Sequence, residues 1–203
     1  KRKFVEVVGR PAAADAFVRL WKEYGEFGQH ANLETGKLRV GGSAVGALVP
    51  PALLKAAVLL EKPDYAAVAE AAAERYAREF IEKGVSYGGP PDALMAPDSE
   101  SAYMLVVMAV AMAERTQSDL WKKRAMSAAD QFSTWVVPYR FAFPEGCEMA
   151  RHHVDTTGSV WANVQNRHSA PGICTMSGES LLALSKLTGE RRFAELHADI
   201  KAF

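Results

Sequence analysis

Two groups of residues in the sequence could carry out acid–base chemistry. The first is APDSES at residues 96–101, where Asp98 and Glu100 stand just before a long apolar segment. Burial at the mouth of such a segment raises the pKa of a carboxyl group toward the range of a general acid. The alternative is structural, because Asp and Ser are preferred as the capping residue of a helix.

The second group lies in residues 149–172, MARHHVDTTGSVWANVQNRHSAPG, which are dense in polar and aromatic side chains. Asp155 is the second carboxylate that acid–base chemistry would need. Long loops of this kind are uncommon and tend to be functional, although a solvated surface loop is the alternative. The side chains that could bind a ligand here through charge, hydrogen bonds or ring stacking are Arg151, His152, His153, Trp161, Asn166, Arg167 and His168.

Other catalytic chemistries find less support in the sequence. His152, His153 and His168 with Asp155 include zinc ligand types, but no HExxH or Cys-x-x-Cys spacing is present, so we predict no metal site. The phosphate-binding, dinucleotide-binding and GxSxG motifs are also absent, and we predict no cofactor. Cys147 and Cys174 could form one disulfide or remain two thiols, and either is favoured over a nucleophilic role.

Composition limits the partners of the chain. Lys and Arg number 24 and Asp and Glu number 24, so no basic surplus indicates nucleic acid or an anionic membrane as a partner. The longest stretch without a charge, residues 40–54, is shorter than a membrane span of about 20 residues. A periplasmic or secreted location would follow if a signal peptide had been removed, and a cytoplasmic one otherwise. The oligomeric state is left open.

The elements that must position these residues are helices in pairs. The pattern predicts an amphipathic helix over 12–26 and a loop or small hairpin over 28–43. Three pairs follow, each with a mostly apolar helix, a short turn and an amphipathic helix: 51–60 with 64–83, 101–113 with 118–135, and 177–187 with 191–203. Long irregular segments join the pairs. If the pairs stack side by side, every long loop lies at one end, and we expect function there.

This organisation resembles the six-hairpin glycosidases, whose fold is the (α/α)6 toroid, and residues 168–196 carry most of the likeness. The resemblance implies an all-α fold. A complete toroid needs about twelve helices, and about seven are expected in this chain. We therefore expect residues 1–203 to form a single domain that is a partial barrel, with the missing hairpins in a larger parent protein.

The resemblance also implies a glycoside hydrolase-like enzyme that cleaves a polysaccharide-derived oligosaccharide, including one with uronic acid. Asp98 and Asp155 would then be the acid and the base or nucleophile, in either order. Trp161 would support a sugar face, and Arg151 or Arg167 would clamp a uronate. Two alternatives stay open: a lyase with a histidine base and Tyr139 or Tyr103 as the acid, and a helical scaffold that binds without chemistry.

Overall fold

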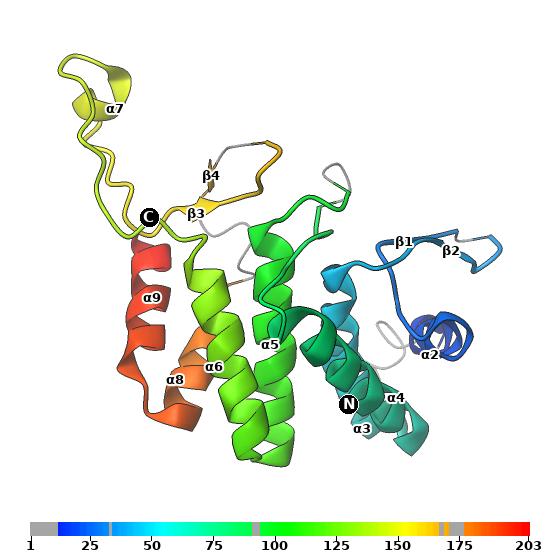
Figure 1. Ribbon diagram of the computed structural model, residues 1–203. Coiled ribbons are helices and arrows are strands. Elements are labelled where there is room, and N and C mark those ends of the chain that lie inside the picture. Colours follow the sequence, from blue (N-terminus) through cyan, green and yellow to red (C-terminus); the bar gives the residue numbers. More distant parts are fainter. Residues whose placement is uncertain (1–11, 33, 91–93, 167–168, 171–176) are drawn as a thin grey trace.

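A computed structural model describes residues 12–32, 34–90, 94–166, 169–170 and 177–203. These residues form eight α-helices and two very short two-stranded hairpins (Figure 1). The chain is therefore mostly helical, as predicted, although it is not free of strands. No helix of the described residues is long and apolar enough to cross a membrane.

Six of the helices form the three predicted pairs. In Figure 1 the short turns that close these pairs lie at the lower end of the molecule, and the long connecting segments lie at the upper end. The expected sorting of short and long connections is thus present. The pairs are α3 (Val49–Leu60) with α4 (Pro63–Tyr76), α5 (Ser99–Thr116) with α6 (Asp119–Ser133), and α8 (Glu179–Thr188) with α9 (Arg191–Ala202).

Helix α5 occupies the centre of the fold and packs against α3, α4, α6 and α8. Its sequence is apolar on every side between Ser101 and Ala113, and nearly all of those residues are buried. An all-round apolar helix is stable only when other elements surround it. The helix is longer than the predicted 101–113, because Asp98 caps it two residues earlier and Gln117 ends it in a left-handed conformation.

The remaining elements pack against the helix pairs or connect them. Helix α2 (Ala12–Tyr24) lies against α3 and α4, and strands β1 (His30–Ala31) and β2 (Leu38–Val40) form the small hairpin expected in residues 28–43. The segment between α6 and α8 was expected to be irregular. It instead contains the four-residue helix α7 (Glu148–Arg151) and the pair β3 (Val160–Trp161) and β4 (Ser169–Ala170). Two further turns of helix, Ala44–Leu48 and Ala77–Ile81, precede α3 and extend α4.

A charged cluster joins the first helix pair to the second. Arg124 of α6 is buried and binds the Glu74 carboxylate through two nitrogens, at 2.6 and 2.9 Å. It also donates to Glu82 at 2.7 Å, and its guanidinium lies 4.8 Å from the centre of the Trp121 ring. Hydrogen bonds from Arg124 hold the pKa of Glu74 below its ordinary value. The cluster therefore stabilises the contact between α4 and α6 while Glu74 is ionised.

We expect Arg124→Met to lower the free energy of unfolding by about 1–3 kcal/mol at neutral pH, because both glutamates lose their charged donor. The folded state lowers the pKa of Glu74, so its contribution is present above the ordinary value of 4.5 and disappears as the pH falls further. The difference between the variant and the parent protein should shrink below that pH. Urea denaturation at several pH values measures it.

Arg191→Met is the matched control, because Arg191 is highly exposed and pairs with Glu195 at 3.6 Å within α9. Exposed pairs of this kind contribute about 0.5 kcal/mol or less. Equal losses in the two variants would contradict a special role for the Arg124 cluster.

Candidate functional site

Asp98 is held inside the protein as the cap of α5. Its exposed fraction is 0%, and its Oδ1 accepts a 2.6 Å hydrogen bond from the Ser101 amide. Its Oδ2 accepts from the Gly89 amide at 2.9 Å and from the Ser101 hydroxyl at 2.8 Å. Such partners are what a buried carboxylate needs in place of water. The arrangement supports the capping interpretation, and a catalytic role for Asp98 stays a prediction.

A second loop, distant in sequence, meets the same helix end. The amide and hydroxyl of Ser99 both donate to the Ala162 carbonyl at 3.0 Å, and the Val164 amide donates to the Pro97 carbonyl at 3.1 Å. Asn163 lies opposite Asp98 in an isolated bridge between the two segments, and its side chain is buried. Asn163 belongs to the polar segment 149–172 that the sequence indicates as a ligand-binding loop. The start of α5 is therefore where the two long connections converge.

Several predicted residues lie near this junction. Glu100 is in the first turn of α5 and is partly buried. Trp161 of β3 is partly exposed, and its amide donates to the Trp135 carbonyl at 2.8 Å. Asn166 lies in the turn after β3, and Arg167 and His168 fall outside the described residues. The structure thus brings Trp161 and Asn166 into the same strand-and-turn segment that packs on the cap of α5.

Tyr103, the acid of the lyase alternative, is buried one turn further along α5. Burial raises its pKa to about 12. A hydroxyl with almost no accessible surface is poorly placed to protonate a leaving group. The other tyrosine of that alternative, Tyr139, is exposed.

Residues 137–157, called here the arm, leave the helices and carry α7 at their tip (Figure 1). The two sides of the arm are joined near its base. Val137 exchanges backbone hydrogen bonds of 2.9 Å with Gly158 and Ser159. The Thr156 hydroxyl donates to the Tyr139 carbonyl at 2.7 Å and accepts from the Phe141 amide at 2.9 Å. The arm is therefore an ordered projection rather than a free loop.

Asp155 lies on the arm, where Arg140 binds it. Its Oδ2 accepts from two nitrogens of Arg140, with Nε at 3.1 Å, and its Oδ1 accepts from the Thr157 amide at 3.0 Å. The hydrogen bonds from Arg140 and then from Thr157 hold the pKa of Asp155 well below its usual range. A carboxylate that stays ionised suits a base or nucleophile rather than an acid.

The predicted cationic residues are at the tip of the arm. Arg151 forms an ion pair with Glu148, and the His152 Nε2 lies 3.4 Å from the other oxygen of that carboxylate. His153 is exposed and has a positive φ of 51°. Cys147 caps α7, with its sulfur accepting from the Ala150 amide at 3.4 Å. Cys174 lies outside the described residues, so a disulfide between the two stays untested.

The predicted residues therefore form two clusters, one at the cap of α5 and one on the arm. Within the described ranges, no group of three His, Cys, Asp or Glu residues is arranged to hold a metal ion. Arg151 would have to exchange its partner Glu148 for a uronate to act as a clamp. The arm offers an ionised carboxylate and exposed rings, and the cap offers Trp161 and Glu100.

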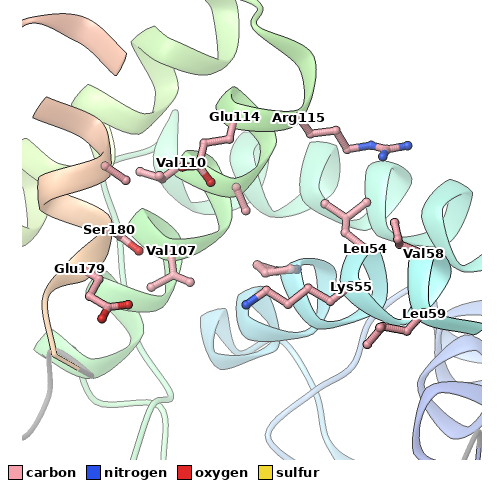
Figure 2. A pocket seen from close by; sticks show the side chains of 13 residues that line it. Leu54, Lys55, Val58, Leu59, Val107, Val110, Glu114, Arg115, Glu179 and Ser180 are labelled. Atoms are coloured by element: carbon pink, nitrogen blue, oxygen red, sulfur yellow. The ribbon is translucent and has the colours of Figure 1, made fainter. Parts of the chain in front are cut away.

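A feature that sequence reasoning missed is an apolar groove of about 900 Å³ along one side of the three apolar helices (Figure 2). We call it the inner groove. Residues of α3, α5 and α8 line it, among them Leu54, Lys55, Val58, Leu59, Val107 and Glu179. The apolar stripe of α3 was visible in the sequence as part of a buried helix. Nothing in that pattern indicated that Val58 and Leu59 would remain exposed.

Comparison of the chain with protein-family models, curated proteins and solved structures finds no match.

We expect Asp98→Asn to lower the free energy of unfolding by about 1–3 kcal/mol. The NH₂ group of the asparagine would replace one carboxylate oxygen, so at least one N–H or O–H group that now donates to Asp98 would lose its acceptor. Asp155→Asn is the matched control, since Asp155 is partly exposed and its pair with Arg140 lies at the surface. We expect that change to alter stability much less, because solvent screens an exposed pair. Chemical denaturation measures both. Unchanged stability of the Asp98 variant would contradict the capping role.

Proposed function

We propose that the protein is a carbohydrate-active enzyme of the glycoside hydrolase type, built as part of an α/α toroid. The supporting observation is the arrangement of the helix pairs. Helices α3, α5 and α8, the first of each pair, line one groove together, and the long connections gather at one end of the molecule. Side-by-side hairpins with their first helices on the inside are the repeating unit of that fold. The ligand site belongs at the long-loop end.

Hydrolysis of a glycosidic bond needs one protonated carboxyl group and one ionised carboxylate. Asp155 supplies the ionised group, because Arg140 and Thr157 lower its pKa. Asp98 has no accessible surface from which to protonate a glycosidic oxygen. We therefore assign the acid to Glu100, which is only partly buried at the start of α5. Because Glu100 and Asp155 lie in separate clusters, this assignment requires the arm to bring Asp155 to the start of α5 when substrate binds.

The substrate is a polysaccharide-derived oligosaccharide. The partly exposed ring of Trp161 offers a flat surface for the apolar face of a sugar. Asn166, in the turn beside it, offers hydrogen bonds to hydroxyl groups. A uronate would find Arg151 on the arm, at the cost of its pair with Glu148.

The second candidate is a helical scaffold that binds a glycan without cleaving it. The full engagement of Asp98 in the cap favours it, because that carboxylate has a structural explanation without catalysis. The scaffold predicts saturable binding and no release of products.

A panel of neutral and uronate-containing polysaccharides decides between these candidates. Release of reducing ends without new ultraviolet absorbance establishes hydrolysis, and new absorbance from unsaturated uronates establishes the lyase reaction. Binding without either product establishes the scaffold. If no polysaccharide yields products or binds, the proposal is wrong.

For a hydrolytic substrate, we expect Asp155→Asn to reduce turnover by about 100-fold or more while the helical circular dichroism signal persists. Glu145→Gln is the matched control, because Glu145 is an exposed carboxylate on the same arm. It should retain activity. Full activity in the Asp155 variant would remove that residue from the mechanism.

A further inference from the structure

A second pocket lies apart from the inner groove, at the end of the molecule where the long connections gather (Figure 1). Its volume of about 360 Å³ is within the range of small-ligand sites. Among the described residues, it shares no lining side chain with the inner groove. We call it the end pocket. Its lining comes from the connection between α4 and α5 and from the C-terminal end of α6, and includes Ser86, Tyr87, Pro97, Gln131, Thr134 and Trp135.

Hydrogen bonds to the backbone fix the polar side chains of the end pocket. The Gln131 Nε2 donates to the Ile81 carbonyl at 2.6 Å. The Thr134 hydroxyl donates to the Gln131 carbonyl at 2.7 Å, and the Ser86 hydroxyl donates to the Asp98 carbonyl at 3.3 Å. Each of the three side chains therefore uses its N–H or O–H group within the protein.

The same side chains still offer oxygen atoms that can accept hydrogen bonds. A carbonyl cannot donate, so Gln131 must present its NH₂ group to Ile81, and its second N–H faces the Ser127 hydroxyl at 3.5 Å. Within the described ranges, no group donates to the Gln131 Oε1 or to the Thr134 and Ser86 hydroxyls. A ligand in the end pocket would thus find acceptors, which bind hydroxyl donors.

The electrostatic surroundings favour a neutral ligand. None of the described side chains that line the end pocket is a carboxylate, an ammonium, a guanidinium or an imidazole. Helix α6 ends at the pocket, and the helical turn Ala77–Ile81 ends just before Gly84 of its lining. The C-terminal end of a helix carries a partial negative charge. An anion would therefore meet acceptors and carbonyl ends without a compensating cation.

Two aromatic residues complete the lining. Tyr87 is half-buried, and its ring packs edge to face on Phe80, with the centroids 5.4 Å apart. The backbone of Trp135 is held by the Phe132 carbonyl at 2.9 Å and by the Trp161 amide at 2.8 Å. The face of an aromatic ring carries partial negative charge, which suits the C–H groups on one side of a sugar ring. The end pocket thus combines fixed rings with hydrogen-bond acceptors.

From these features, we infer that the end pocket binds a neutral saccharide unit, whose hydroxyls donate to Gln131, Thr134 and Ser86. The ring of the sugar lies against Tyr87 or Trp135. The inference shares its class of ligand with the proposed function and rests on it to that extent. It needs neither the cleavage chemistry nor the arm, because the end pocket is outside both clusters of predicted site residues.

Titration of the isotope-labelled chain with the methyl glycosides of glucose, galactose and mannose tests this binding by NMR. At least one should shift the Trp135 indole N–H resonance in a saturable way at millimolar concentrations, and Trp135→Phe identifies that resonance by its loss. The uronide that matches the bound glycoside is anionic, and sorbitol has the hydroxyls without a ring. Each should bind about tenfold more weakly or worse. No shift with any glycoside, or equal binding of sorbitol or the uronide, overturns the inference.

The variants Gln131→Met and Thr134→Val remove acceptors and keep the size of the side chains. Each should weaken binding about three- to tenfold, since one hydrogen bond is lost. Thr116→Val is the matched control, because Thr116 is also exposed and donates to a backbone carbonyl, that of Met112 at 2.7 Å, but does not line the end pocket. It should bind like the parent protein. If circular dichroism shows that Gln131→Met has unfolded, Thr134→Val decides, and parent-like affinity in it overturns the inference.

Trp161→Ala separates this inference from the proposed function, because Trp161 is the sugar platform of that proposal and does not line the end pocket. The saturable shift at Trp135 should persist in this variant. Loss of the shift would place the sugar on Trp161 and overturn the inference. A persistent shift in a protein that releases no products from any polysaccharide would support the end pocket and contradict the proposed hydrolysis.

Discussion

The buried carboxylate of Asp98 is the interaction on which the arrangement of the loops depends. A buried carboxyl group is costly unless the protein supplies hydrogen-bond partners in place of water, and Gly89 and Ser101 supply them. Meeting that demand fixes the segment before α5 against the first turn of the helix. Pro97 and Ser99, on either side of Asp98, then form hydrogen bonds with the segment that follows β3. One side chain thus sets the positions of two connections that are far apart in sequence.

From that fixed end, the central helix organises the rest. Ala109 and Ala113 of α5, and Ala125 and Ala129 of α6, are fully buried small residues, which let neighbouring helices approach closely. Burial of apolar surface has no direction of its own. The angle between the first two helix pairs therefore also depends on a directional polar contact. The two-pronged contact of Arg124 with Glu74 supplies it, because a planar guanidinium binds a carboxylate in a fixed orientation.

Helix positions could be predicted from the sequence because the spacing of apolar residues and the preferences for capping residues are local properties. The turns around residues 61–62 and 117–118 are short, so their helices had to pack against each other. The pairing within the arm could not be predicted, because the Thr156 hydroxyl bonds backbone groups more than ten residues away. The same limit applies to the site. Capping by Asp98 could be predicted, because residue preference at a helix start is local, and the structure shows that cap. The pairing of Asp155 with Arg140 could not be predicted, because the two residues meet only through the fold of the arm.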